Sequence, residues 1–172
     1  MIFTRAITKD EIEQACDLFN LYVDPGHNVD DYSDIRTKAV FIAKHSGKIV
    51  GAVTCGFLFD ELDNFDSYWL SQNPGRLAWI ESIAVEDRYQ GRGYGKYLAE
   101  VAIAWCNKNI SDRIVALCWE SPKDRQSLIL FKDLGFEEVE HFKHPWAGEY
   151  CVVCGNDCSC DATLVFKEKL DA

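Results

Sequence analysis

The chain lacks any long apolar run. Its hydrophobic stretches fall well short of the roughly 20 consecutive apolar residues that a membrane-spanning helix needs. It also lacks the basic and then apolar start of a secretory signal peptide. Internal repeats and low-complexity tracts are missing as well. These absences predict a cytoplasmic protein with no membrane partner.

Basic residues are scarce. The chain has 18 Lys and Arg against 28 Asp and Glu, which gives a formal net charge of -10 at pH 7. Because nucleic-acid binding depends on a basic face, we expect no nucleic-acid partner. The acidic balance is compatible with a cationic amine as substrate, and equally with a role in solubility alone.

Length and composition indicate one globular domain over residues 1–172, since 172 residues with 48% hydrophobic content can bury a full-sized core. Apolar spacing predicts helices over residues 9–22, 95–108 and 124–134. Strands are expected over residues 2–5, 40–44, 49–58, 78–85, 114–119, 136–141 and 162–167, with a hairpin turn at 46–47. This order predicts an α/β fold with one central mixed sheet flanked by helices.

The most informative segment is the turn that follows the expected strand 78–85. Three glycines alternate there, at Gly91, Gly93 and Gly95, and a helical pattern begins directly afterwards. Glycines allow consecutive backbone N–H groups to face a ligand, and a helix N-terminus adds partial positive charge at the same place. The turn therefore predicts a site for a phosphate or pyrophosphate.

The spacing differs from two other phosphate-binding motifs. A P-loop requires Ser or Thr after Gly-Lys, whereas Lys96 is followed by Tyr97. A dinucleotide-binding turn requires Gly-x-x-Gly at its end, whereas these glycines alternate strictly. Residues 90–95 instead resemble the Gln/Arg-x-x-Gly-x-Gly/Ala acyl-CoA signature of the GNAT superfamily of N-acyltransferases.

The resemblance covers almost the whole chain. Residues 124–136 are similar to the second signature of that family, and the order of elements from 2 to 167 also fits. The resemblance implies the GNAT fold and transfer of an acetyl group from acetyl-CoA to a primary amine, by direct attack of the amine on the thioester. It leaves open small-molecule amines, peptide amines, a longer acyl group, and a monomer or homodimer.

The resemblance also implies which residues contact the cofactor. The loop amides would bind the pyrophosphate, backbone at the end of strand 78–85 would polarise the thioester, and nearby basic side chains would add local charge. The expected contacts are Ile83, Ala84, Val85, Arg88, Gln90, Gly91, Arg92, Gly93, Tyr94, Gly95, Lys96, Asp124 and Phe131.

Glu81 is the candidate general base. An alkyl amine with a pKa of about 10.4 is mostly protonated at neutral pH, so a base must remove a proton before attack. Strand alternation predicts that Glu81 shares a face with Trp79, Ile83 and Val85, and family members often have an acidic residue on this face. The alternative is a carboxylate paired with an Arg or exposed at the strand end.

Two positions depart from the family pattern. Phe131 stands where many members have a Tyr that protonates the leaving thiolate. Because a thiol pKa is about 8.5, the thiolate can leave without an acid; alternatively Tyr94 or Tyr97 substitutes. The other interpretation of Phe131 is core packing. Asp124 replaces an Asn, and it can cap a helix but cannot donate an amide hydrogen bond.

A second motif is a cysteine cluster in an insert at about residues 145–161. Four thiolates with this spacing suit tetrahedral zinc, Gly155 permits a tight bend, and four protein ligands would make the metal structural. The alternative is a set of reduced or redox-active thiols. The four expected ligands are Cys151, Cys154, Cys158 and Cys160; the scattered cysteines Cys16, Cys55, Cys106 and Cys118 are expected to be buried.

The acidic and aromatic loop before strand 78–85 is a candidate wall of the acceptor pocket. Carboxylates and aromatic rings hold an ammonium group by charge and cation–π contact. The alternative is a solvated loop whose aromatic side chains pack on the core. The residues concerned are Asp60, Glu61, Asp63, Asp66, Tyr68 and Trp69. A rival for the whole chain is a non-catalytic acyl-CoA-binding module whose zinc-stabilised insert docks a partner.

Overall fold

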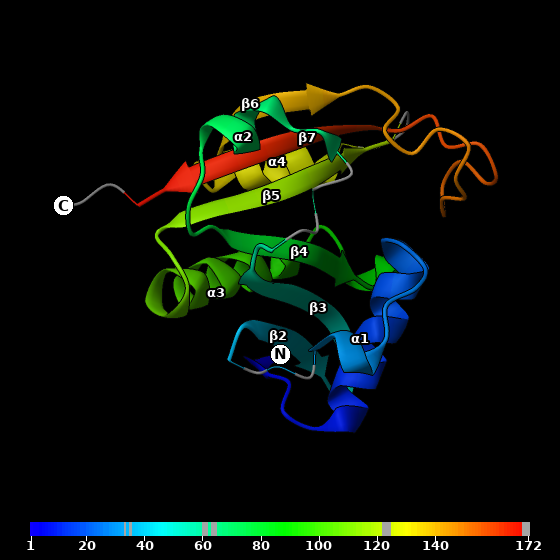
Figure 1. Ribbon diagram of the computed structural model, residues 1–172. Coiled ribbons are helices and arrows are strands. Elements are labelled where there is room, and N and C mark those ends of the chain that lie inside the picture. The colour runs from blue at the N-terminus through cyan, green and yellow to red at the C-terminus, as the bar shows by residue number, and fades with distance from the viewer. Residues whose placement is uncertain (33, 35, 60–61, 63–64, 122–124, 170–172) are drawn as a thin grey trace.

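The computed structural model describes residues 1–172 except 33, 35, 60–61, 63–64, 122–124 and 170–172. Its centre is a seven-stranded sheet in the order β1-β2-β3-β4-β5-β7-β6 (Figure 1). Neighbouring strands are antiparallel except β4 and β5, which are parallel. The strands are β1 Ile2–Arg5, β2 Lys38–His45, β3 Lys48–Phe57, β4 Ala78–Val85, β5 Arg113–Glu120, β6 Glu137–Phe142 and β7 Asp161–Glu168.

Helices cover both faces of this sheet. They are α1 Lys9–Tyr22, α2 Tyr68–Gln72, α3 Tyr94–Asn109 and α4 Gln126–Asp133, with 3₁₀ turns η1 Val29–Tyr32 and η3 Asp87–Tyr89. The mixed α/β fold expected from the sequence is confirmed, and each expected helix and strand is present with ends shifted by at most two residues. Helix α2 was not expected, because it is a single short turn inside a polar loop.

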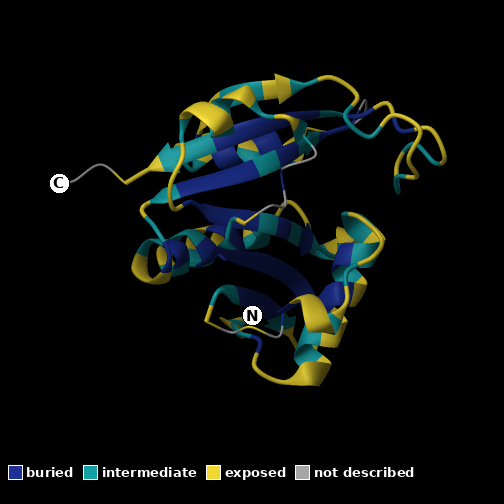
Figure 2. Cartoon of the chain, viewed as in Figure 1, coloured by how far each residue is buried: buried dark blue, intermediate teal, exposed yellow. Residues whose placement is uncertain are grey.

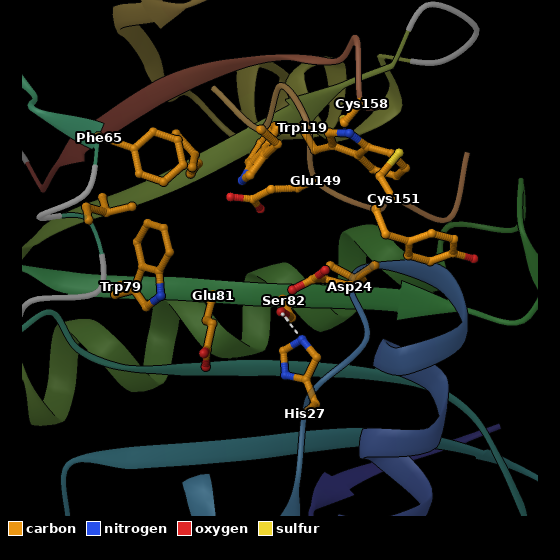
Figure 3. Close-up of a pocket in the computed structure, with 15 residues that line it drawn as sticks. Asp24, His27, Phe65, Trp79, Glu81, Ser82, Trp119, Glu149, Cys151 and Cys158 are labelled. Atoms are coloured by element: carbon orange, nitrogen blue, oxygen red, sulfur yellow. Dashed lines mark hydrogen bonds between the residues drawn. The ribbon is translucent and has the colours of Figure 1, made fainter. Parts of the chain in front are cut away.

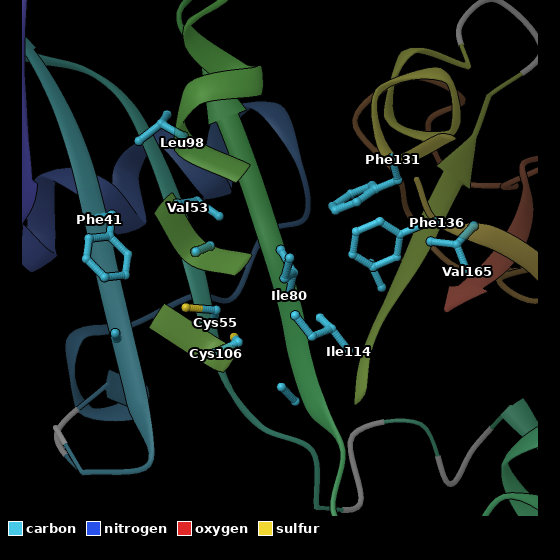
Figure 4. Packing of buried hydrophobic residues seen from close by; sticks show 14 of the residues in the cluster. Phe41, Val53, Cys55, Ile80, Leu98, Cys106, Ile114, Phe131, Phe136 and Val165 are labelled. Atoms are coloured by element: carbon cyan, nitrogen blue, oxygen red, sulfur yellow. The ribbon is translucent and has the colours of Figure 1, made fainter. Parts of the chain in front are cut away.

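The core lies in layers on both faces of the sheet. The largest cluster packs the sheet against α3 and α4 and includes Ile80, Leu98, Ile114 and Phe131 (Figure 4). The opposite face carries a cluster under α1 and another around Trp79. Figure 2 shows burial concentrated in the central strands, whereas the connection between β6 and β7 is largely exposed or half-buried. The central strands are thus well buried, whereas the segment that joins β6 and β7 is irregular.

A β-bulge interrupts β4 at Glu81. The register with β3 pairs Thr54 with Ser82 but Cys55 with Ile80, so Glu81 is the extra residue. Ile83 and Val85 consequently pack on the α3 side with Ile80. The expectation that Glu81 shares a face with Ile83 and Val85 is therefore wrong, because the bulge reverses the alternation after Glu81.

The parallel strands β4 and β5 diverge beyond the middle of the sheet. Their pairing runs from Ala78 with Ile114 to Ile80 with Ala116, and no later pair occurs among the described residues. Strand β5 continues alongside β7 as far as Glu120, and Figure 1 shows its separation from β4. The second half of β4 is therefore paired on one side only. In the described part of the chain, no helix has the length and apolarity to cross a membrane.

Candidate active site

A cavity of about 290 Å³ lies where β4 and β5 diverge (Figure 3). The end of α1 and the following loop contribute one side, β4 and β5 the floor, and the β6–β7 connection the opposite side. The lining residues are Val23, Asp24, His27, Leu62, Phe65, Trp79, Glu81, Ser82, Leu117, Trp119, Trp146, Glu149, Tyr150, Cys151 and Cys158. Trp79, Glu81 and Ser82 all reach it because of the bulge.

Glu81 has a fixed orientation in this cavity. The hydroxyl of Thr54 on β3 donates to Glu81 Oε2 at 3.1 Å and accepts the Ser82 backbone N–H at 3.2 Å. Thr54 is only 1% exposed, so this hydrogen bond is shielded from water. The carboxylate is half-buried and lines the cavity, which places a proton acceptor where a bound molecule can reach it.

His27 is a second titratable group that the sequence did not reveal. Its Nδ1 lies 2.7 Å from the Tyr32 hydroxyl, and its Nε2 lies 3.5 Å from Ser82 Oγ. The Asn20 side chain holds the His27 backbone, because its Oδ1 accepts the His27 N–H at 2.8 Å. Burial, and then the charge of Glu81, raise the pKa of Tyr32, so the hydroxyl stays neutral. No spacing in the sequence marks a lone His in a polar loop.

The cavity combines negative charge with aromatic surface. Its carboxylates come from Asp24, Glu81 and Glu149, and its rings include Trp79 and Trp119. Such a lining suits a cationic amine with an apolar body. The buried Trp79 Nε1–H has no hydrogen-bond partner among the described residues, so a ligand oxygen at this point would satisfy it.

The loop before β4 contributes differently from the sequence-based expectation. Leu62 and Phe65 line the cavity, whereas Asp66, Tyr68 and Trp69 do not. The reason is that Glu140 on β6 accepts the Tyr68 backbone N–H at 3.0 Å, and the Trp69 ring packs on Phe166 at 4.8 Å. This part of the loop is thereby attached to the sheet. The expected residues Asp60, Glu61 and Asp63 lie outside the described residues.

The glycine turn lies at the end of β4. Gly91 and Gly93 have φ angles of 69° and 82°, which disfavour residues with a Cβ, whereas Gly95 lies inside α3. Gly93 caps α3 without a side-chain hydrogen bond, so the first backbone N–H groups of α3 are available to an anion. The Gln90 side chain donates to the Val85 carbonyl at 2.8 Å and ties the turn to the strand.

The remaining expected cofactor contacts differ in exposure. Arg88, Arg92 and Lys96 are exposed beside the turn; Arg88 pairs with Glu86, and Arg92 lies 5.7 Å from the Tyr89 ring. The residues Ile83, Ala84, Val85 and Tyr94 are buried or half-buried near the strand end.

The segment 124–136, which resembles the second family signature, contains the two other expected cofactor contacts, Asp124 and Phe131. Phe131 is 3% exposed and packs edge-on against Phe136 at 5.0 Å, as the packing alternative for it anticipated. Asp124 lies outside the described residues. Their contacts to a cofactor, and those of the turn residues, stay predictions.

The four clustered cysteines come together. All four sulfur atoms lie within 4.8 Å of one another, compared with the S···S separation of about 3.8 Å that a tetrahedron with Zn–S bonds of about 2.3 Å requires. The Cys154 N–H points to Cys151 Sγ at 3.1 Å, and Gly155 has a φ of 82°. Hydrogen bonding from the Ser159 backbone lowers the pKa of Cys154 to about 7. The donor set and its geometry fit a metal ion.

The other four cysteines differ from the clustered ones because all four are buried in apolar surroundings. They are unpaired and buried, as their apolar surroundings predicted: Cys16, Cys55, Cys106 and Cys118. Burial raises the pKa of Cys118 to about 12 and that of Cys16 to about 11. They are packing residues.

Comparison with known proteins gives one family match. Residues 9–136 match the model of the acetyltransferase (GNAT) family, which is well over half of the chain. A search of the curated proteins finds no match.

Solved structures share the fold over nearly the full length. Arabidopsis thaliana NAA60 in complex with acetyl-CoA has a TM-score of 0.69 at 16% identity, covering 97% of this chain and 97% of that chain. A GNAT family acetyltransferase from Elizabethkingia anophelis with acetyl-CoA bound has a TM-score of 0.68 at 20% identity, with coverage of 98% and 97%. The ribosomal-protein-S18-alanine N-acetyltransferase from Escherichia coli has a TM-score of 0.67 at 16% identity, with coverage of 99% and 96%.

Proposed function

The chain belongs to the GNAT family of acetyltransferases, and we propose that it transfers an acetyl group from acetyl-CoA to a primary amine. The observation that carries this proposal is the Glu81 carboxylate, which Thr54 orients inside the cavity between the diverging strands. The open N-terminus of α3 at the glycine turn supports binding of the coenzyme A pyrophosphate. Two similar structures contain acetyl-CoA, which agrees with this co-substrate.

Glu81 acts in this proposal as the general base. It accepts one proton from the ammonium form of the acceptor, and the freed nitrogen lone pair attacks the carbonyl carbon of the thioester. The C–S bond then breaks, the electron pair goes to sulfur, and the nitrogen releases its second proton to water. Backbone near Ala84 and Val85, where β4 is paired on one side only, would polarise the carbonyl oxygen.

The leaving thiolate needs no acid from this chain. Phe131 has no proton to give, and both alternative tyrosines pack toward the edge strand: the rings of Tyr94 and Tyr97 lie 6.2 Å and 4.2 Å from that of Phe3. Neither is among the residues that line the described cavity. Since a thiol has a pKa of about 8.5, its thiolate is an adequate leaving group near neutral pH.

The acceptor proposed is a cationic primary amine with a nearby hydrogen-bond acceptor. The three cavity carboxylates favour the charge, and the unpaired Trp79 Nε1–H favours an adjacent oxygen. Peptide α-amines meet this description, and so do hydroxylated small amines. The similarity to an enzyme that acetylates the S18 alanine makes peptide amines the first to test.

We also propose that Cys151, Cys154, Cys158 and Cys160 bind one zinc ion as a structural site. Their sulfur separations and the bend at Gly155 support it. Metal analysis of protein purified without a His-tag should give one zinc per chain. A content far below one would contradict the zinc site.

Calorimetric titration with acetyl-CoA, followed by thiol release with a panel of amines, tests the function. Micromolar affinity and amine-dependent release of coenzyme A are expected. Binding without release for any amine would favour the non-catalytic acyl-CoA-binding module. Absence of acetyl-CoA binding would contradict both the acetyltransferase and the acyl-CoA-binding module.

A further inference from the structure

The connection between β6 and β7 forms one wall of the acetyl-transfer cavity. Five of its residues line the cavity, and they include two of the four clustered cysteines. Figure 3 shows Cys151, Cys158 and Glu149 opposite Glu81, Ser82 and His27. The five residues are Trp146, Glu149, Tyr150, Cys151 and Cys158; residues 146–160 are called the cysteine segment below.

We propose that metal binding by the four cysteines assembles the acceptor-binding wall of this cavity, so that metal occupancy controls binding of the cationic amine and not of acetyl-CoA. This inference rests on the proposed function and on the proposed zinc site. It gives the metal a role in substrate binding although all four of its ligands come from the protein.

The cysteine segment has little regular structure to hold it. Residues 143–160 consist of turns, bends and irregular backbone, with one isolated bridge between Cys151 and Gly155. That bridge has two backbone hydrogen bonds, of 2.8 Å and 2.9 Å. Because four coordinated thiolates contribute free energy that is available only when the ligands are brought together, a metal would supply the order that a helix or strand supplies elsewhere.

Backbone hydrogen bonds join the sulfur cluster to Glu149, one of the three acidic residues that line the cavity. The Cys158 backbone N–H donates to the Glu149 carbonyl at 3.2 Å, and the Glu149 N–H donates to the Trp146 carbonyl at 3.0 Å. Fixing Cys158 on a metal therefore fixes the backbone of Glu149 and, through it, Trp146. These two residues place a negative charge and an aromatic ring in the cavity, which are the groups that attract an ammonium ion.

The cofactor side is built independently of this segment. The glycine turn is attached to β4 through Gln90 and Val85, and α3 packs on the sheet through Leu98 and Ala102. None of the residues in that side belongs to residues 146–160. Loss of metal should therefore leave acetyl-CoA binding intact.

Cys154→Ser is the variant that tests the inference most directly. Cys154 is a candidate ligand but does not line the cavity, so its substitution leaves the cavity lining itself unchanged. Val153 is its exposed neighbour and not a ligand, which makes Val153→Ser the matched control. Cys154→His retains a zinc-binding side chain and should restore part of the effect.

The experiment compares the holoprotein, the protein after chelation under reducing conditions, and the three variants Cys154→Ser, Cys154→His and Val153→Ser. Four properties are measured: metal content, calorimetric acetyl-CoA affinity, KM for a peptide α-amine as the acceptor, and hydrogen exchange of residues 146–160. Cys154→Ser and metal removal should raise KM for the amine at least about tenfold, equal to about 1.4 kcal/mol, and abolish slow exchange in the segment. Acetyl-CoA affinity should not change, and zinc should reverse the effects of chelation.

The inference is overturned if the metal-free protein keeps the same exchange protection in residues 146–160, or the same KM for the amine. A Cys154–Cys160 disulfide in place of metal in the protein as isolated would also overturn it, since those sulfurs lie 3.5 Å apart. Failure of the proposed function looks different: the zinc-loaded protein would show metal-dependent exchange protection but would acetylate no amine.

Discussion

The β4 side of the cavity and the cysteine segment opposite it are built from different kinds of structure. Glu81 sits on a strand between other strands, with its carboxylate held by the buried Thr54 hydroxyl. Glu149 sits among turns, and the Cys158 N–H holds its carbonyl. Under the proposed function, a buried strand fixes the general base, whereas the proposed metal site fixes the carboxylate that would bind the acceptor.

The substitution Glu81→Gln removes the proposed general base from the β4 side of the cavity and should have the largest effect on turnover. The amide cannot accept the proton, so turnover should fall about 10²–10⁴-fold, the usual contribution of a general base. Acetyl-CoA affinity by calorimetry should stay the same. Glu100→Gln, on the exposed face of α3, is the control and should retain full turnover. Undiminished turnover in Glu81→Gln would remove Glu81 from the mechanism.

Sequence periodicity predicted the framework of this side well. Strand β4 has the bounds that its apolar run indicated, and α3 begins one residue from the expected start. The face of Glu81 relative to Ile83 was not predictable, because the bulge depends on the register with β3. Thr54 was missed for the same reason: it lies 27 residues from Glu81 in the chain.

The opposite side shows which contacts a sequence can reveal and which it cannot. Cysteine spacing predicted that four sulfurs would meet, because each is close in sequence to the next and shares one chemistry. Nothing in that spacing indicated that Cys151 and Cys158 would line the cavity with Asp24 and His27. For the acidic loop, Trp69 follows the packing alternative, since attachment of residues 67–69 to Glu140 places its ring on Phe166 and not in the cavity.

Substitution Thr54→Val sharpens the claim that packing fixes the reacting group. It keeps the side-chain shape but removes the donor to Glu81 and the acceptor of the Ser82 N–H. An unsatisfied buried polar group costs about 1–3 kcal/mol. The free energy of unfolding, measured with denaturant, should therefore fall by about that amount. We expect kcat to fall with little change in KM for the amine. Thr54→Ser should restore both, and a Thr54→Val variant with normal kcat would show that Glu81 needs no such support.

Substitution Gly93→Ala tests the cofactor part of the same side. Its φ of 82° is left-handed, and an alanine there costs about 1–2 kcal/mol. Because the turn presents the first N–H groups of α3, the strained turn should also bind acetyl-CoA more weakly. Gly47→Ala is the matched control: Gly47 has a φ of 83° and open space around it, but lies in the β2–β3 hairpin. Equal acetyl-CoA affinities in the two variants would contradict a role for the turn.

The smallest effect is expected at the start of α1, the helix whose far end leads to Asp24 and His27. Glu11 Oε1 accepts a hydrogen bond from Lys44 Nζ at 2.6 Å, and Glu11 Oε2 accepts hydrogen bonds from the backbone N–H groups of Ile7 and Thr8. The hydrogen bond from Lys44, followed by those amides, lowers the pKa of Glu11 to about 2. A carboxyl with a lowered folded-state pKa stabilises the fold above its unfolded pKa of about 4.3, and this contribution is lost as the pH falls toward 2.

Glu11→Gln should therefore lower the free energy of unfolding by about 1 kcal/mol at pH 7. The difference from the unsubstituted protein should shrink through the interval from about pH 4.3 to about pH 2. Denaturant unfolding across this range measures it. Glu13→Gln, whose ion pair with Lys9 is exposed and 3.7 Å long, is the control and should show almost no difference at any pH. A Glu11→Gln difference that persists at pH 2 would mean that shape, not charge, holds the start of α1.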